Sequence, residues 1–494
     1  LRALVLSTLD RTTMLWSHPP DSRPRPRQLS LSPRCVEYNI WNALLWSVNL
    51  WSLEDTGVGV CQWQPGEELL PGRIHVYPGP ARSLLPALHE LPAMGMLSVL
   101  PRPNQAFWTL SGLWSTWIPG FEEEQASRQS TGRQRYSWKW YADALQHALT
   151  GLPDVLEEGS ILSLLLEAEP SFTGAVFAGF GAAGFRPEEA ALHEEQARFI
   201  VSWADASSAV PLLQKQQCLS LEDFLVDMLL DLGEPAGYFK LAAAAQQRLA
   251  APGLQAAARL QKASGIMVRH SEMLEQVLED RKVFIRMDPH LDPESGVYWL
   301  KDPAGASEPL GDRVERVVLE QLSERECVAE ADLLEQVYKS FAQVCIPGEQ
   351  LVAACAASYA ELEGNSWLLR PDEYPEKRRA DCVTVREMLV QLGGRLGFEV
   401  EHGDAVRWWD GKRQPWAFHV SSSAALGPML STGEGHRACV VCPGSRSGLV
   451  LERIRRDDRF SLAMERGARV VKFRHVRRLL EDPHLKRHNF ETRL

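Results

Sequence analysis

Residues 161–183 read ILSLLLEAEPSFTGAVFAGFGAA, and this stretch decides the expected fold. The apolar run at 161–167 is typical of a buried strand, and the small residues at 171–183 favour a helix that follows it. Residues from 185 onward and at 197–203 predict the last strands of the same sheet. Strands that alternate with helices along a chain predict an α/β sheet whose strands are mostly parallel.

The same alternation extends towards the N-terminus. Residues 94–100 form a short apolar run that ends at Pro101, which predicts a buried strand. The alternating residues 73–77 predict a further strand. Helices are expected at 1–16, 36–53 and 141–156. Together these elements predict an α/β domain over residues 1–204.

The composition is that of an ordinary globular protein, with 494 residues, 45% of them hydrophobic and 24% charged. This length is sufficient for about two to four domains. No apolar run reaches the roughly 18 residues of a membrane span, and the start of the chain lacks the cleavage site of a signal peptide. Nine scattered cysteines suit a reducing compartment, so we expect a cytoplasmic protein.

The charge of the chain is uneven. A net charge of −11 argues against a protein that coats nucleic acid through bulk charge, but residues 451–494 hold 13 Lys and Arg against 7 Asp and Glu. A basic face on an acidic body predicts a focused DNA contact, and a solvated helix surface is the alternative interpretation. The expected phosphate contacts are Arg453, Arg455, Arg456, Arg469, Lys472, Arg474, Arg477 and Arg478.

The middle of the chain is predicted to be mostly helical. Residues 205–304 form an Ala-, Leu- and Gln-rich helical region that includes helices at 221–232 and 241–264 and ends in a Pro- and Gly-rich linker. The next section, 305–382, predicts three helices and a strand, at 310–322, 329–344, 348–362 and 366–370. This order resembles a winged helix, a common nucleic-acid module. Its recognition helix, 348–362, has no Lys or Arg, which counts against direct reading of base edges.

The last section, residues 383–494, predicts a small α/β domain. A helix at 384–396 and a strand at 398–401 precede a hairpin around Asp410-Gly411. Two further strands are expected at 438–442 and 468–473, with a helix at 461–465 between them.

This last section resembles restriction-endonuclease-like domains. In that family an Asp and a Glu-x-Lys pair on a hairpin bind a divalent metal for phosphodiester hydrolysis. Asp404 occupies the first position, whereas His419 and Ser421 replace the Glu and the Lys. One carboxylate is a poor magnesium site, so no metal is expected, and an unrelated β-hairpin is the alternative interpretation.

Residues 99–118 read VLPRPNQAFWTLSGLWSTWI, and they resemble the catalytic motif of adenine-specific DNA methylases. In that family Asp-Pro-Pro-Tyr ends a strand, and an aromatic helix with Leu-Ser and Trp-Leu follows. Pro101 and the pattern from Leu110-Ser111 to Trp117-Ile118 are retained, but Val99 stands for the Asp and Arg102 for the Tyr. The resemblance covers roughly residues 1–200 and corresponds to the C-terminal half of such a methylase.

The resemblance implies a protein that uses S-adenosylmethionine and methylates the exocyclic amine of adenine in DNA after flipping the base out. In that family the Asp of the motif binds the amine and the Tyr stacks on the flipped base. Val99 offers no acceptor, and an unpaired buried amine would cost roughly 1–3 kcal/mol. Arg102 is suited to stacking on a base or to contacting phosphate. We therefore expect a methyltransferase-like sheet with a degenerate site at Val99, Pro101 and Arg102.

Glycine-rich residues 179–184 match the pattern G-x-G-x-x-G but stand in the wrong context for a cofactor loop. A dinucleotide fingerprint follows a strand and opens a helix, whereas this one closes the helix predicted at 171–183. We expect its glycines to allow close packing and to end that helix. No Phe-x-Gly-x-Gly loop occurs in residues 1–98, so the cofactor-binding residues are unknown.

Cys439-x-x-Cys442, with His436 before it, has part of the spacing of a zinc site. Structural zinc sites need four ligands, and no second pair lies nearby in the sequence. The run 438–442 also has the pattern of a buried strand, in which Cys behaves as a small hydrophobic residue. We favour the strand.

The sequence thus predicts a DNA-methylase-related protein, catalytically impaired, that binds DNA or acts as a scaffold in a DNA modification or defence system. One alternative is an active methyltransferase completed by a missing N-terminal half or by a partner subunit, with S-adenosylmethionine as cofactor. Another is a protein-interaction module with a Trp-rich face, because ten of the 16 Trp residues precede residue 141. None of these interpretations includes a membrane partner or a DNA target sequence.

Overall fold

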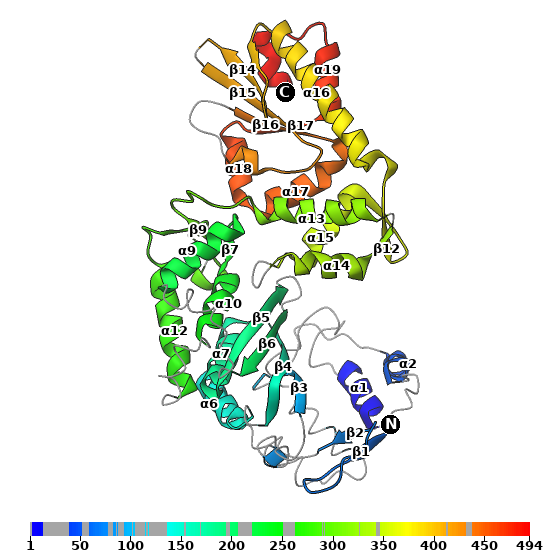
Figure 1. Ribbon diagram of the computed structural model, residues 1–494, viewed down its shortest axis with the longest axis vertical. Coiled ribbons are helices and arrows are strands. Elements are labelled where there is room, and N and C mark those ends of the chain that lie inside the picture. Colours follow the sequence, from blue (N-terminus) through cyan, green and yellow to red (C-terminus); the bar gives the residue numbers. More distant parts are fainter. Residues whose placement is uncertain are drawn as a thin grey trace.

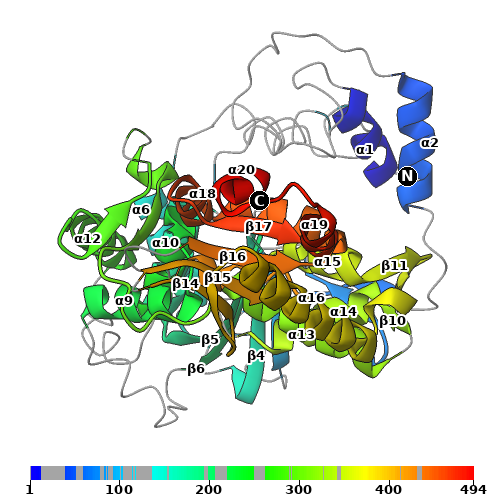
Figure 2. The same cartoon turned by 90° about the horizontal axis from the view of Figure 1, so that it is seen from above.

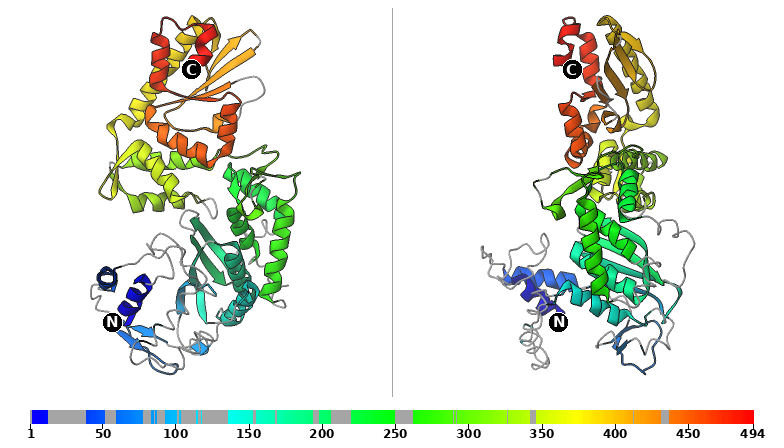
Figure 3. Two further views of the ribbon diagram at one scale, coloured as in Figure 1. Left: turned by 180° about the vertical axis from the view of Figure 1, so that it is seen from behind. Right: turned by 90° about the vertical axis from the view of Figure 1, so that its left-hand side faces the viewer.

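The computed structural model is a mixed α/β protein with several small sheets, drawn out along one axis (Figure 1). One sheet lies towards each end of this axis, and helices lie between them, as two further sides also show (Figure 3). The described residues are 2–12, 39–51, 59–77, 83–84, 86, 93–100, 102–103, 114, 117, 136–152, 155–167, 169–193, 198–205, 220–249, 262–288, 290, 292–325, 327–341, 346–411, 413–430 and 437–494.

The N-terminal sheet has the strand order β3-β4-β6-β5. Its strands are β3 (Ala93–Val99), β4 (Leu156–Glu167), β5 (Phe185–His193) and β6 (Arg198–Asp205). Only β3 and β4 are parallel, because β6 runs antiparallel to both β4 and β5. The prediction of a mostly parallel sheet was therefore wrong. Only residues 194–197 separate β5 from β6, and so short a connection joins antiparallel strands.

Helices cover one face of this sheet. They are α6 (Trp138–Leu149), α7 (Pro170–Ala183), α10 (Tyr238–Leu249) and α12 (Ala263–Leu278). Leu162 and Leu164 of β4 and Trp203 of β6 are buried against them, and Trp203 lies 4.8 Å from Phe180 between ring centroids. The predicted helix 171–183 is confirmed as α7. The predicted helix 141–156 and strand 161–167 exist as α6 and β4, but α6 ends at Leu149 and β4 begins at Leu156, so the end of the predicted helix was wrong.

The other face of the sheet is open. The side chains of Leu97, Val99 and Ile200 are 85%, 69% and 39% exposed, and they alternate along β3 and β6 with residues that face the helices. In the middle of this face Ser163 and Ser202 lie with their hydroxyl oxygens 3.4 Å apart. We call these five residues the open face. The prediction that 94–100 is a buried strand was wrong, because Leu97 and Val99 are exposed and β3 is an edge strand of the sheet among the described residues.

The glycines at 179–184 pack and end α7, as predicted. A Cβ atom on Gly179 would lie 2.8 Å from Leu145 Cβ and 3.0 Å from the carbonyl oxygen of Ala142, so Gly179 permits the close approach of α6. Gly184 ends the helix in the left-handed conformation, with φ 103°.

The N-terminal elements form a separate group. Helices α1 (Arg2–Thr12) and α2 (Ile40–Trp51) pack side by side, and β1 (Val60–Gln62) pairs in parallel with β2 (Ile74–Val76). Figures 1 and 2 show α1 and α2 standing apart from the β3 sheet. Both predicted helices and the strand at 73–77 are confirmed in shorter form, and β1 was not predicted.

The next section joins helices to a small antiparallel sheet. Helix α9 (Leu221–Leu232) matches its prediction, and the predicted helix 241–264 is represented by α10 and by the start of α12, with 250–261 outside the described residues. The sheet has the order β7-β9-β8. Its strands are β7 (Ala236–Gly237), β8 (Phe284–Arg286) and β9 (Val297–Leu300). Strand β9 and the 3-10 turn Pro293–Ser295 lie in the stretch predicted as a linker.

Three helices and a three-stranded antiparallel sheet follow. The helices are α13 (Leu310–Glu324), α14 (Glu330–Lys339) and α15 (Glu349–Tyr359), as predicted. The strands, in the order β10-β12-β11, are β10 (Cys327–Ala329), β11 (Ala360–Glu363) and β12 (Ser366–Leu369). Only β12 was predicted from the sequence.

The C-terminal sheet has the order β13-β14-β15-β16-β17. Strands β13 (Glu399–Glu401), β14 (Val406–Asp410) and β15 (Arg413–Val420) are antiparallel, whereas β16 (Arg437–Cys442) and β17 (Arg469–Lys472) continue in parallel from β15. All five were predicted. The helices are α16 (Pro375–Arg395), α17 (Ser447–Arg456), α18 (Asp458–Glu465), α19 (Phe473–Glu481) and α20 (Phe490–Arg493).

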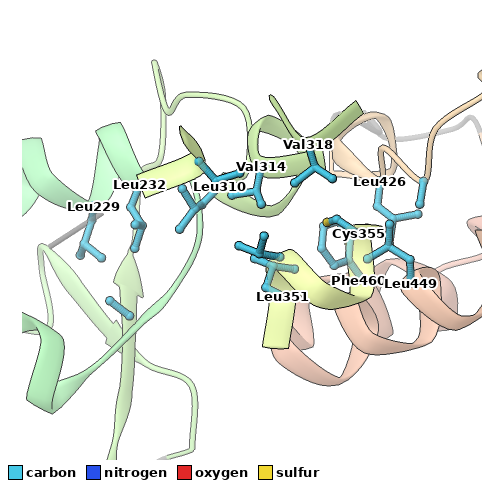
Figure 4. Packing of buried hydrophobic residues seen from close by; sticks show 14 of the residues in the cluster. Leu229, Leu232, Leu310, Val314, Val318, Leu351, Cys355, Leu426, Leu449 and Phe460 are labelled. Carbon is cyan, nitrogen blue, oxygen red and sulfur yellow. The ribbon is translucent and has the colours of Figure 1, made fainter. Parts of the chain in front are cut away.

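Both faces of the C-terminal sheet are covered. Val441 and Val471 face the core with α16 and α19, whereas Val440 and Cys442 face the core with α17 and α18. The second of these cores extends without a break from α9 through α13 and α15 to α18, as Figure 4 shows from Leu229 to Phe460. It joins residues of three predicted domains, whose boundaries remain a prediction.

Candidate functional site

The degenerate motif lies at the end of β3, beside the start of α7. Val99 is the last residue of the strand, and its side chain points to the open face. Pro101 lies outside the described residues, and Arg102 is buried. Ligands of open α/β sheets usually bind at the carboxyl ends of parallel strands, which is the edge where Arg102 lies.

The Arg102 side chain closes this edge. It forms an ion pair with Glu169, the residue that precedes α7. Its guanidinium carbon also lies 5.7 Å from the ring centroid of Trp138 and 5.7 Å from that of Phe172. The positive charge is thus neutralised by a carboxylate and enclosed by two aromatic rings. The Arg102 charge is therefore already paired and is not a free cation for a phosphate.

The aromatic pattern after the motif is described at two positions, and the rest of 104–118 lies outside the described residues. Trp114 is buried and packs with Leu6 and Leu9 of α1, whereas Trp117 is exposed. Trp114 of this pattern therefore contacts α1.

Arg453 does not lie on the surface. Its guanidinium is buried, forms ion pairs with Asp312 and, at 3.1 Å, with Glu315, and donates to the carbonyl oxygen of Ala424 at 3.1 Å. The prediction that it contacts a phosphate is corrected on this ground, because carboxylates of α13 already enclose the charge. Burial lowers the pKa of Arg453 to about 10.

The other predicted basic contacts divide into two sets. Arg456 pairs with Glu234 at 3.3 Å, Arg469 donates to the carbonyl oxygens of Met464 and Ala468, and Lys472 is half-buried. The exposed set, which forms no ion pair within the described part of the chain, is Arg455, Arg474, Arg477 and Arg478.

Three members of the exposed set share one helix face. Arg474, Arg477 and Arg478 occupy positions i, i+3 and i+4 of α19, while Phe473, Val476 and Leu479 face the core. Arg455 lies on α17, which packs on the opposite face of the sheet. We call the three arginines of α19 the basic face.

A buried charge network was not predicted from the sequence. It consists of Asp312, Glu315, Glu373, Arg446 and Arg453, all of them buried. Arg446 pairs with Glu373 at 2.5 Å, and its guanidinium carbon stacks 3.5 Å from the ring centroid of Tyr359. Burial of this kind leaves no signal in a single sequence, because arginine is normally a surface residue.

The network holds a loop at the carboxyl end of β15. The backbone N–H of Ala424 donates to Glu315 Oε1 at 2.7 Å, and that of Gly427 donates to Asp312 Oδ2 at 2.9 Å. Tyr359 donates its hydroxyl to Glu315 Oε1 at 2.6 Å. Even with these bonds, burial raises the pKa of Glu315 above its ordinary value. The loop is therefore fixed to α13.

The residues of the nuclease-like pattern do not meet as a metal site. Asp404 is exposed in the turn before β14, and His419 lies half-buried on β15. Within the described residues no group of three His, Cys, Asp or Glu is placed to hold a metal ion. His436 lies outside the described residues.

Cys439 and Cys442 lie on β16, which confirms the predicted strand. Cys439 faces the core with α16, and Cys442 faces the core with α17, so their sulfurs point to opposite sides of the sheet. Burial raises the pKa of Cys442 to about 11 and that of Cys439 further. Both behave as buried apolar residues.

Helix α15 packs between α13 and α17. Leu351, Val352 and Cys355 are buried there in the same core as Leu449. Helix α15, the recognition helix in the winged-helix interpretation, is thus packed against protein on these sides, which agrees with its lack of basic residues.

Compared with protein-family models, curated proteins and solved structures, the chain gives no match of significance. In the part of the chain that the structure describes, no helix combines the length and the apolar character that crossing a bilayer requires.

Proposed function

We propose that this chain is a cytoplasmic DNA-methylase-related protein that has lost methyl transfer and binds DNA within a modification or defence system. The observation that carries the proposal is the closed edge at Arg102 and Glu169, at the position where the resemblance requires an open acceptor. Val99 beside it has an aliphatic side chain that points to the open face.

A methylation assay tests the loss of activity. The chain, incubated with S-adenosylmethionine and adenine-containing duplex DNA, is expected to transfer no methyl group. Val99→Asp is expected to stay inactive, because the Arg102–Glu169 pair still closes the edge. Methyl transfer by the unaltered chain would refute this part of the proposal.

The basic face supports the DNA contact. Its three guanidinium groups point away from the core and form no ion pair among the described residues, unlike Arg316, Arg437 and Arg493, which pair with acids. Phosphate contacts of this kind give affinity without sequence readout and weaken with salt.

A matched pair of triple variants tests the contact by fluorescence anisotropy with a labelled duplex. Replacing Arg474, Arg477 and Arg478 by Gln should weaken binding and reduce the slope of log K against log salt by about 0.9 per lost contact. Replacing Arg316, Arg437 and Arg493 by Gln removes the same charge and should change the slope little. Equal effects of both variants would assign the affinity to net charge instead.

The finer folds belong to the same proposal. The order α13-β10-α14-α15-β11-β12 with an antiparallel sheet supports a winged-helix-like domain at 305–382. The meander β13 to β15 followed by parallel strands supports a nuclease-like fold at 383–494. In this proposal both domains act as scaffolds, since α15 is covered and no metal cluster is found among the described residues.

The second candidate function is an active methyltransferase completed by an N-terminal half or by a partner subunit. The observation that favours it is the open face, whose exposed Leu97 and Val99 end at an edge strand that pairs only with β4 in the described structure. Leu97→Lys should then abolish copurification of a completing subunit, while the Lys339→Gln control, on exposed α14, should retain it.

A protein-interaction module is the third candidate. Helix α2 buries Ala43 and Ser47, but Trp41 remains 62% exposed and Leu45 is also exposed. This function predicts a stable partner that Trp41→Ser releases, together with no mobility shift of DNA at low salt.

A further inference from the structure

Cys61 and His75 lie opposite each other on the parallel strands β1 and β2. The Cys61 sulfur is 3.4 Å from His75 Nδ1 and 3.9 Å from Nε2, so Nδ1 is the nearer ring nitrogen. Sulfur is a large atom, and this separation is within hydrogen-bonding distance for a thiol. Both side chains are partly exposed, which leaves the sulfur open to a small molecule.

The main chain of Leu70 holds the imidazole in place. His75 Nε2 lies 3.1 Å from both the backbone nitrogen and the carbonyl oxygen of Leu70. Nε2 accepts from the Leu70 N–H in one neutral tautomer and donates to the Leu70 carbonyl oxygen in the other. In the second tautomer Nδ1 carries a lone pair directed at the thiol. Leu70 lies in the loop between β1 and β2. This loop is held in place because Trp63 is buried and donates its indole N–H to the carbonyl oxygen of Glu67 at 2.8 Å.

A nucleophile, a base within hydrogen-bonding reach and a third group that orients the base form the usual arrangement of an activated thiol. Among the other described cysteines, Cys355, Cys439 and Cys442 are buried, and burial raises the pKa of half-buried Cys382. Cys327 is exposed, and no hydrogen bond from its thiol is found among the described residues. A structural metal does not explain the pair, since the described residues contain no third ligand beside it. Cys61 therefore differs from them in its chemistry.

We propose that Cys61 is a reactive thiol activated by His75, and that it takes a low-molecular-weight disulfide as its electrophile. His75 Nδ1 accepts the thiol proton, and the Cys61 thiolate attacks one sulfur of the disulfide. A new sulfur–sulfur bond forms on Cys61 as the old one breaks, and the second sulfur leaves as a thiolate that takes up a proton. Thiol and disulfide exchange without any net oxidant.

The test uses the full chain, oxidised glutathione as the probe, and peptide mass spectrometry to follow each cysteine. Cys327 is the internal control, because it is exposed and has no histidine partner in the described structure. Cys61 should form the mixed disulfide about tenfold faster than Cys327 at neutral pH. Equal rates in the unaltered chain would overturn the proposal without any variant.

His75→Gln separates activation from exposure. It should slow Cys61 to the rate of Cys327 and leave Cys327 unchanged, while hydrogen exchange of the peptides that cover residues 60–76, followed by mass spectrometry, should confirm that the loop keeps its structure. A Cys61 rate that His75→Gln does not change, with the loop intact, would also overturn the proposal. If the loop unfolds, the comparison of Cys61 with Cys327 in the unaltered chain decides alone.

Discussion

The two large sheets of this molecule are built to different degrees of completeness. The N-terminal sheet is covered on one face only and exposes Leu97 and Val99 on the other. The C-terminal sheet is buried on both faces, and a charge network fixes the loop at its edge. The difference indicates that other described parts of the chain already cover both faces of the C-terminal sheet, whereas the N-terminal sheet has surface that an additional structure is able to cover.

The buried arginines of the two regions lie in different surroundings. Arg102 pairs with Glu169, the residue before the neighbouring helix α7. Arg453 of α17 pairs with Asp312 and Glu315 of α13, far away in the sequence, and also donates to a backbone carbonyl. Each charge that folding buries must be matched by a partner, so Arg453 makes the position of α17 depend on α13.

The largest loss of stability is expected from Arg453→Met. The change leaves Asp312 without its cation and Glu315 with Arg446 alone, at 4.0 Å, and breaking a buried pair in this way typically costs about 3–5 kcal/mol. Arg455→Met, two residues away and exposed, should change the free energy of unfolding by less than about 0.5 kcal/mol. Urea denaturation measures both, and equal losses would contradict the structural role of the network.

Substitutions on the covered and open faces of the N-terminal sheet should differ nearly as much in their effect on the free energy of unfolding. Leu164→Ala empties a fully buried position and should cost about 2–5 kcal/mol. Leu97→Ala, on the neighbouring strand, should cost less than about 0.5 kcal/mol, because that side chain is already in water. A large loss at Leu97 in the isolated chain would mean that the open face is covered in solution.

The charge network should also make the stability of the fold depend on pH. Burial alone would raise the pKa of Glu373, but hydrogen bonds from Arg378 and Arg446 outweigh it and lower the pKa to about 2. The stabilisation is therefore present above the ordinary value of 4.5 and is lost as the pH falls from there to about 2. Its size is on the order of 3 kcal/mol. Glu373→Gln should remove this part of the dependence in denaturation measured over that range.

The smallest differences in stability are expected from alanine substitutions at two adjacent glycines of α16. A Cβ atom on Gly393 would lie 2.6 Å from Trp408 Nε1, so Gly393→Ala should cost about 1–3 kcal/mol by overpacking. Gly394 meets nothing within 4 Å, and Gly394→Ala should stabilise the helix by about 0.5–1 kcal/mol. Thermal denaturation should shift in opposite directions, and a shared direction would contradict this packing.

Local signals allowed the sequence to predict several elements accurately. Helix α9 matches its predicted range because Ser220 and Asp223 form a capping box and Gly233 ends the helix, with φ 69°. The end of α7 at Gly184 was predicted from the same kind of signal. Strands β10 and β11 were missed, because three or four residues carry too little periodicity and depend on pairing with β12.

Contacts between residues far apart in the chain could not be predicted from the sequence. The antiparallel direction of β6 depends on which strands it pairs with, and no local residue encodes that choice. Arg453 was assigned to the surface because its sequence neighbours are basic, whereas its partners lie far away on α13. Cys61 and His75 were not singled out, since 13 residues separate them and only the pairing of β1 with β2 brings them together.

The loop tied to α13 has a practical consequence for dissecting the molecule. Residues 383–494 expressed by themselves would keep Arg446 and Arg453 but lose every carboxylate that neutralises them, because Asp312, Glu315 and Glu373 all lie upstream. Such a fragment would expose the apolar side of α17 along with two bare guanidinium groups. Any soluble C-terminal fragment therefore has to include α13, and only one that also includes α9 keeps this core whole and Arg456 paired with Glu234.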